Sequence, residues 1–321
     1  MLSVTLLLAK IAPVFCLMGL GFGLRRGRVL TREADQSLMR VVVNVLYPAL
    51  ILRFVLGNPA LDDPRQLWLA PAVGFGTIVL GFGLAWMAAK ALRGGHPRER
   101  GTFAFTTGIY NYGYIAIPVV LALPGIDNDA TVGVLLIHNV GIEVAIWTVG
   151  IALLTTGSKR SLWSRVINAP VVTLLVALSL NLLGLDTHLP GFVTESILWL
   201  SQCAIPIGLV LAGATLADLL REERALSLLR APRAGVVAAL LRLGLLPLAF
   251  LLLARFLPGL TPELRIVLVV QAAMPAGIFP LVVSRHFEGD TRTAVQVVLG
   301  TTLLGLITIP LWIAFGTAWV L

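Results

Sequence analysis

NYGYIAIP (residues 111–118) and AMPAGIFP (residues 273–280) each place proline, glycine and polar residues in the middle of a long hydrophobic segment. A helix that breaks inside a bilayer leaves N–H and C=O groups that lipid cannot satisfy, so each break must face protein or a water-filled cavity. Two such breaks at matching places in the two halves of a chain indicate a transporter's binding site. The two stretches therefore predict a membrane protein that moves a small solute.

The composition indicates the same class of protein. Of the 321 residues, 58% are hydrophobic and 12% are charged, whereas about 25% of residues are charged in soluble domains. The mean hydropathy is +0.93. The two cysteines, Cys16 and Cys203, lie in apolar runs, where a thiol behaves as a small hydrophobic group. We therefore expect an integral membrane protein without a disulfide or a metal site.

The hydrophobic segments are long enough to predict the number of spans. A spanning helix needs about 20 mostly apolar residues. Ten segments meet this requirement: 4–24, 36–56, 67–92, 100–122, 130–155, 165–184, 193–217, 232–256, 264–285 and 291–320. The arginines of the first segment follow its apolar run, so we expect a retained helix and not a signal peptide. The prediction is an all-α integral membrane fold with ten transmembrane helices.

Basic residues are distributed unevenly among the loops. They gather in the linkers after segments 1, 3, 5, 7 and 9, as Arg25 and Arg26 or Lys159 and Arg160 do, whereas few lie in the other linkers. The positive-inside rule then makes the basic linkers cytoplasmic and leaves both termini outside an inner or plasma membrane. Short basic loops also account for the net charge of +8. We therefore expect membrane lipid, and no nucleic acid, as a partner.

The two halves of the chain resemble each other. At similar spacing, Pro13, Pro48 and Pro118 of the first half match Pro170, Pro206 and Pro280 of the second, and Asn44 and Gln202 each stand four residues before a matched proline. Chance alignment among 18 prolines is the alternative explanation. Five spans per repeat is an odd number, so the second copy enters the membrane the other way up. We expect an inverted repeat of residues 1–158 and 159–321, with Asn44, Pro48, Gln202 and Pro206 facing the scaffold.

Two regions resemble a known family. The stretch AMPAGIFPLVVSRHFEGD (273–290), followed by AVQVVLGTTLLGLITIP (294–310), is similar to the ninth and tenth spans of the auxin efflux carrier family, and NYGYIAIP resembles its fourth span. The resemblance implies the fold of bile-acid/sodium symporters, in which broken spans 4 and 9 cross at the membrane centre. It also implies a scaffold of spans 1, 2, 6 and 7 and a moving transport domain of spans 3–5 and 8–10. Plant auxin carriers have a pair of asparagines at the first break where this chain has Asn111 alone, so auxin is not implied.

The breaks supply the candidate binding residues. Half-helix N-termini favour an anion such as a carboxylate, and free carbonyls at half-helix C-termini favour a cation. Asn111 can bind a carboxylate or satisfy backbone groups of the crossing. Tyr112 and Tyr114 can line the site or pack against neighbouring helices. The candidates for substrate binding are Asn111, Tyr112, Gly113, Tyr114, Pro118, Pro275, Ala276, Gly277, Ile278 and Pro280.

Polar residues inside other spans are candidates for ion coupling. Asn139 and Glu143 share a helical face, with His138 beside them, and Gln271 precedes the second break. Glu143 can carry a proton, help to hold sodium, or belong to a structural hydrogen-bond network. Arg242 can pair with an anionic substrate or with Glu143. We expect no cofactor other than a coupling ion, H⁺ or Na⁺.

These patterns favour one function over its alternatives. The stretch GLGFG (residues 19–23) lies inside a span and indicates close helix packing instead of a nucleotide loop. No ATP-binding or hydrolase motif is present, so we do not expect an enzyme. We expect a secondary active or facilitative permease of small organic anions, in particular carboxylates, that uses elevator-type alternating access. A sodium-coupled symporter of the bile-acid type and a non-transporting receptor are the alternatives, and a homodimer would anchor an elevator scaffold.

Overall fold

The protein is helical throughout the part that its computed structural model describes, residues 4–91, 97–154, 168–222 and 233–321. The long continuous helices are α1 (Val4–Arg26), α4 (Pro64–Ala91), α11 (Gly191–Glu222) and α17 (Thr291–Val320). The others are α2 (Arg32–Val41), α3 (Tyr47–Val55), α5 (Pro97–Gly108), α6 (Ala116–Ala122), α7 (Asn128–Ala145), α8 (Ile151–Leu154), α10 (Ala169–Leu182), α13 (Arg233–Leu240), α14 (Leu246–Phe256), α15 (Pro262–Ala273) and α16 (Phe279–His286).

Three of these helices continue into the next through a π-helical turn. The turns are η1 (Val42–Leu46) between α2 and α3, η3 (Ile146–Gly150) between α7 and α8, and η5 (Leu241–Leu245) between α13 and α14. The segments η2 (Pro59–Leu61) and η4 (Asp186–His188) are short 3₁₀ turns in loops. Because π turns inside α-helices are frequent at functional sites, η3 and η5 make α7 and α13–α14 candidates for the functional site.

Side-chain caps explain where several helices begin. Thr31, Asp127, Asn168, Thr261 and Asp290 each accept a hydrogen bond from the backbone N–H three residues later. Such a bond satisfies one of the donors that the first turn of a helix leaves free. The helices therefore start at the polar residues that separate the hydrophobic segments.

The helices are of the kind that crosses membranes. Seven stretches of the described chain are long and apolar enough to span a bilayer: Thr5–Arg26, Arg32–Val55, Pro64–Lys90, Asn128–Leu154, Gly191–Arg221, Arg233–Phe256 and Thr291–Val320. Helix α10 is apolar but shorter, and residues 97–122 and 262–286 are each divided into two short helices. The prediction of an all-α membrane fold is confirmed, while the described residues hold seven long apolar helices and do not by themselves establish the ten predicted spans.

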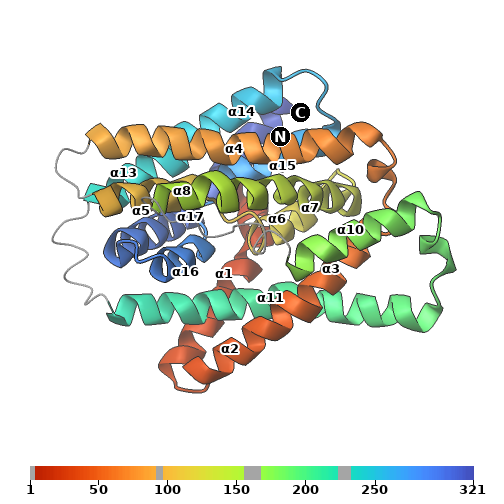
Figure 1. Cartoon of the computed structure of the whole chain (residues 1–321), viewed down its shortest axis with the longest axis horizontal. Coiled ribbons are helices and arrows are strands. Elements are labelled where there is room, and N and C mark those ends of the chain that lie inside the picture. Colours follow the sequence, from red (N-terminus) through yellow and green to blue (C-terminus); the bar gives the residue numbers. More distant parts are fainter. Residues whose placement is uncertain (1–3, 92–96, 155–167, 223–232) are drawn as a thin grey trace.

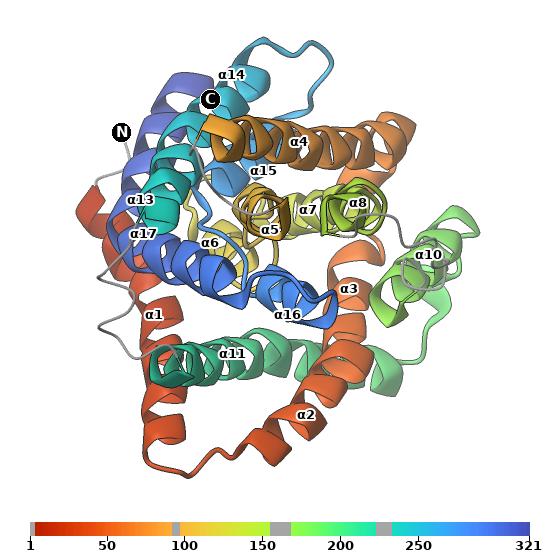
Figure 2. The same cartoon turned by 60° about the vertical axis from the view of Figure 1, so that its left-hand side comes forward.

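The helices pack in two groups. Figure 1 shows α4 and α11 running along opposite sides of the molecule, with α5, α7 and α15 between them. In the first group α11 contacts α1 and α3, and α3 contacts α10. In the second group α4 contacts α5 and α7, α15 contacts α7, α14 and α17, and α16 and α17 contact each other and α5. Figure 2 shows the first group below and beside the second. The expected repeat boundary at 158/159, like Lys159 and Arg160, lies outside the described residues.

Ion pairs connect the first group at one end. Arg25 of α1 pairs with Asp35 of α2 and, at 3.3 Å, with Asp218 of α11. Arg32 also pairs with Asp218, at 3.4 Å. The shared carboxylate of Asp218 therefore ties the ends of α1, α2 and α11 together.

Candidate functional site

The two predicted breaks exist, and they contact each other. Helix α5 ends at Gly108 and α6 begins at Ala116, while α15 ends at Ala273 and α16 begins at Phe279. Between these ends, Tyr110 and Ala276 form an antiparallel bridge. The N–H of Asn111 donates to the carbonyl of Pro275 at 2.8 Å, and the N–H of Gly277 donates to the carbonyl of Ile109 at 3.0 Å. We call this junction, residues 109–115 and 274–278, the crossing.

The crossing is closely packed around its backbone. A Cβ atom on Gly277 would lie 3.2 Å from the carbonyl oxygen of Tyr110, closer than most side chains tolerate. Ala276 is buried, and its N–H donates to Oγ1 of Thr301 in α17 at 3.2 Å. Small residues at these two positions therefore let the second break reach the first.

The side-chain amide of Asn111 makes one hydrogen bond within the crossing, through its oxygen. Its Oδ1 accepts a hydrogen bond from the N–H of Ile115 at 3.2 Å, which supports the start of α6. Its Nδ2 makes no hydrogen bond to the described residues, and the residue is 9% exposed. Asn111 can therefore support the backbone through Oδ1 and bind a solute through Nδ2, because the two roles use different atoms.

Tyr112 is held from both sides by polar residues. Its hydroxyl donates to Oε1 of Glu143 at 2.6 Å, and its carbonyl accepts from Nδ2 of Asn139 at 3.0 Å and from Nε2 of Gln271 at 3.2 Å. The indole of Trp147 donates to the second oxygen of Glu143 at 3.0 Å. These contacts join α7, α15 and the first break.

Gly113 and Tyr114 face the first helix group. The ring of Tyr114 packs edge-on against Tyr47 of α3, with the ring centroids 6.3 Å apart. A Cβ atom on Gly113 would lie 3.0 Å from the hydroxyl of Tyr47, and one on Gly208 of α11 would lie 2.2 Å from the ring of Tyr114. The first break therefore contacts both α3 and α11.

The remaining candidate residues of the breaks lie in the short helices α6 and α16 or shortly before them. Pro118 is half-buried in α6, and Ile278 is half-buried just before α16. Pro280 is buried in the first turn of α16, where its carbonyl accepts from the Ser284 hydroxyl at 2.7 Å. Pro275 packs close to Gly305 of α17. Prolines at these places disfavour one continuous helix through either break.

Two predicted network residues lie elsewhere. Arg242 is fully buried and binds the carbonyls of Gln271, Ala272 and Met274, and no ion pair joins it to Glu143 within the described chain. His138 makes no hydrogen bond to Tyr112 or Glu143 among the described residues. It is buried against Gly74 of α4, and neither of its ring nitrogens has a partner among the described residues. The helical turn of about 100° per residue separates His138 from the face shared by Asn139 and Glu143.

The four scaffold candidates lie away from the crossing. Asn44 is exposed in η1 and donates to the carbonyl of Arg40 in its own helix at 2.8 Å. Pro48 lies in the first turn of α3, where the helix changes from π to α winding. Gln202 and Pro206 are exposed on α11. Pro206 interrupts no helix, because α11 continues through it.

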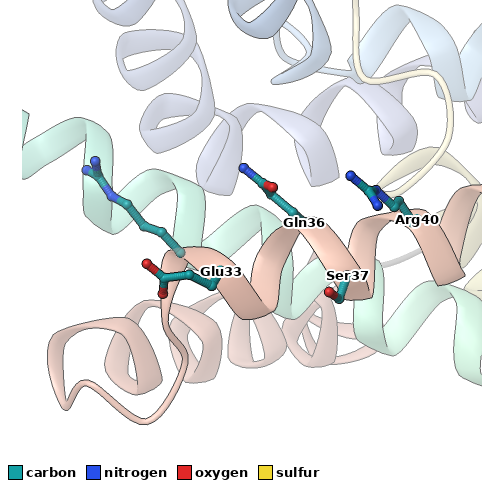
Figure 3. Close-up of a pocket in the computed structure, with 5 residues that line it drawn as sticks. Glu33, Gln36, Ser37 and Arg40 are labelled. Carbon is teal, nitrogen blue, oxygen red and sulfur yellow. The ribbon is translucent and has the colours of Figure 1, made fainter.

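Two hollows lie between the helix groups. The larger, of about 340 Å³, separates α6 from α3 and α11, and its lining includes Arg53, Pro118, Gln202 and Pro206. The smaller, of about 40 Å³, lies beside Glu143 and Asn139 and is closed by α3 and α10. A further shallow cleft belongs to the surface of α2 alone, where Glu33, Gln36, Ser37 and Arg40 line it (Figure 3).

Sequence reasoning missed several residues around the crossing. The ring of Tyr110 is fully buried and its hydroxyl lies 2.9 Å from Oγ1 of Thr77 in α4. Trp147 and Thr301 contribute the hydrogen bonds described above. Tyr110 precedes the NYGYIAIP motif directly and Trp147 stands four residues after Glu143, so an i, i+4 search would have found the tryptophan.

Nearly the whole chain is similar to a known protein family. A model of the family described as "Membrane transport protein" matches residues 6–165 and 157–313, which together cover nearly the whole chain. The chain belongs to this family, that of the auxin efflux carriers. The expected resemblance is thus confirmed, and the family is one of transporters and not of enzymes.

Two archaeal relatives agree with the family assignment. A protein of Methanothermobacter thermautotrophicus, described as an uncharacterized transporter, is 25% identical over 306 residues, covering 94% of this chain and 96% of its own. A second uncharacterized transporter, from Methanocaldococcus jannaschii, is 22% identical over 295 residues, with 88% and 90% covered. The chain is therefore similar to whole transporters over nearly all its length.

Proposed function

We propose that this family member is a secondary active or facilitative transporter of small organic anions, in particular carboxylates, and that it works by elevator-type alternating access. The observation that carries the proposal is the crossing, where two interrupted helices meet backbone to backbone in the interior of a membrane protein. Non-helical backbone at membrane depth is tolerated where it is buried in protein or lines a cavity, and in transporters such breaks form the binding site.

The chemistry of the crossing favours an anion. The Nδ2 of Asn111 is a hydrogen-bond donor that none of the described residues uses, and a carboxylate oxygen is a suitable acceptor. The half-helices α6 and α16 both begin at the crossing. The larger hollow, of about 340 Å³, has the size of a small-molecule pocket. We propose that an organic acid enters through this hollow and binds between the two breaks.

We further propose a ten-span inverted repeat, which the long apolar helices alone do not establish. The split segments 97–122 and 262–286 and the short helix α10 would bring the seven long spans to ten, as an inverted repeat of residues 1–158 and 159–321. Both termini would then lie outside the inner or plasma membrane. The group of α1, α3, α10 and α11 would be the scaffold, and the group that carries the crossing would move past it. A homodimer would hold such a scaffold still.

Ion coupling is proposed for Glu143. This carboxylate binds Tyr112, which belongs to the crossing, and it borders the 40 Å³ hollow. A hollow of this size holds water or a small cation and excludes an organic acid. We propose that Glu143, supported by Asn139 and Gln271, takes up H⁺ or Na⁺ if transport is coupled to either ion.

The decisive experiment is uptake of radiolabelled mono- and dicarboxylates into liposomes that contain the purified protein, with and without imposed proton or sodium gradients. Saturable uptake of one acid supports the anion transporter, and accumulation driven by one gradient identifies the coupling ion. A sodium requirement would favour the bile-acid type of symporter. Saturable binding without flux would favour the receptor and refute the proposal.

Asn111→Ala tests the binding site within the same assay. Removing the free amide should reduce kcat/KM for the transported acid by at least tenfold, since a hydrogen bond to a charged group contributes about 1.5–3 kcal/mol. Asn44→Ala is the matched control, because Asn44 is an exposed amide bonded within its own helix. Equal uptake by both variants and the wild type would remove Asn111 from the site.

A further inference from the structure

Arg242 is the largest fully buried side chain of the described protein. It lies in the π-helical turn η5, inside a stretch long enough to span the membrane. An ionised side chain inside a membrane is costly and in most cases marks a function. The expected roles, pairing with Glu143 or binding the substrate directly, do not account for the contacts that it makes.

The guanidinium of Arg242 binds the end of α15. Its Nε donates to the carbonyl of Met274 at 3.0 Å, and its Nη2 donates to the carbonyls of Gln271 at 3.1 Å and Ala272 at 3.2 Å. Helix α15 ends at Ala273, so these carbonyls lie at the end of the interrupted helix, where intrahelical donors run out. The Gln271 carbonyl also accepts from the backbone N–H of Met274 at 3.3 Å. Nη1 is buried and has no partner among the described residues.

Aromatic rings enclose the same guanidinium. Its central carbon lies 5.0 Å from the ring centroid of Tyr110 and 5.1 Å from that of Phe250. The two rings pack edge to face, with centroids 5.6 Å apart. Ring faces attract a cation within about 6 Å. No carboxylate pairs with Arg242 in the ranges that the structure covers, so helix carbonyls and ring faces supply the negative potential around it.

Carbonyl groups at the end of a broken membrane helix are the ligands with which transporters bind Na⁺. We propose that Arg242 is a built-in cation of the crossing: its guanidinium permanently fills the cation position at the C-terminal end of α15. Any coupling ion must then act elsewhere. The site also keeps a fixed positive charge beside the second break, which favours an anionic solute. The inference concerns the crossing itself and does not depend on which solute is carried.

The geometry explains why an arginine fits this position. The guanidinium is a planar fork of five donors, whereas a lysine ammonium is a compact charge with three. Three carbonyls from residues 271, 272 and 274 and two ring faces suit the planar group. Arg242 is therefore a positioning residue, because it acts on the backbone of the second break.

Chemical rescue tests the proposal without any substrate. Arg242→Ala should lower the unfolding temperature of the purified protein, and free guanidinium at tens of millimolar, far below denaturing concentrations, should raise it again by about 2–4 °C or more. Choline chloride at the same concentration controls for ionic strength. Arg255→Ala is the matched variant, because Arg255 is an exposed arginine of the neighbouring helix α14. The wild type and Arg255→Ala should gain nothing from guanidinium.

A second pair of variants covers the case in which Arg242→Ala does not fold. Arg242→Lys keeps a cation at this position, and Arg242→Met keeps a flexible side chain without charge. Arg242→Lys should unfold at a higher temperature than Arg242→Met, because only the lysine can bind the carbonyls. An Arg242→Met protein as stable as Arg242→Lys, or a guanidinium response shared by all variants, would overturn the proposal.

Discussion

The contact between Gly208 of α11 and the ring of Tyr114 can be tested by adding one carbon atom. In Gly208→Ala, the new Cβ would lie 2.2 Å from Cε1 and 2.4 Å from Cδ1 of Tyr114. Ordinary contact is about 4 Å, so the ring must move by more than about 1 Å. The ring of Tyr47, with its centroid 6.3 Å away, limits this movement.

The magnitude follows from the rigidity of both partners. Overpacking of this kind costs about 1–3 kcal/mol, and each kcal/mol lowers the unfolding temperature by about 1–2 °C in a chain longer than 250 residues. Tyr114→Ala removes the ring, so Gly208→Ala should be nearly neutral in that background. A double-mutant cycle on the unfolding temperature therefore measures the contact.

Controls separate this contact from a general effect of alanine. Gly19→Ala adds a Cβ where nothing lies within 4 Å, and it should leave the unfolding temperature unchanged or slightly higher. Because Gly208 and Tyr114 belong to different helix groups, we also expect Gly208→Ala to change the initial rate of transport. An equal cost of Gly208→Ala with and without the Tyr114 ring would refute the reasoning.

Two further changes test the packing of α1 and the role of Glu143. Gly21→Ala would place a Cβ 1.9 Å from the carbonyl oxygen of Val210, whereas Gly23→Ala meets nothing within 4 Å; thermal unfolding should show a lower stability for Gly21→Ala only, and equal stabilities would contradict the close contact of α1 with α11. Glu143→Gln keeps one acceptor oxygen for two donors, Tyr112 and Trp147, so it should cost about 1 kcal/mol and abolish any dependence of uptake on pH or sodium. A dependence that persists in liposome uptake by Glu143→Gln would place ion coupling at another residue.

The sequence predicted the breaks because their signal is local. Proline and glycine weaken a helix wherever they stand, and the ends of α5 and α15 fall beside the two motifs. The similar set Gln202, Pro206 and Gly208 leaves α11 continuous, so the signal indicates a break without fixing it. The close packing expected for GLGFG is found at Gly21, while Gly19 and Gly23 face open space. A pattern of small residues does not by itself tell which of them meets the neighbouring helix.

The partners of the polar residues were harder to predict because they depend on tertiary packing. Arg242 binds backbone carbonyls and not Glu143 because α15 ends beside it. These carbonyls belong to residues 29 to 32 positions later in the chain. The bridge between Tyr110 and Ala276 consists of one residue pair, too short for any periodic pattern. His138 and Glu143 are near in sequence, yet only Glu143 lies on the side of α7 that reaches Tyr112.

The two hydrogen bonds of the crossing come entirely from the main chain. Asn111 and Gly277 donate through their backbone N–H groups to the carbonyls of Pro275 and Ile109, so no side-chain group takes part in either bond, although position 277 must stay small. A proline at position 111 or 277 would delete a donor. The joint between the two halves can thus persist while the surrounding side chains change, which leaves evolution free to alter the solute that is recognised without rebuilding the part that holds it.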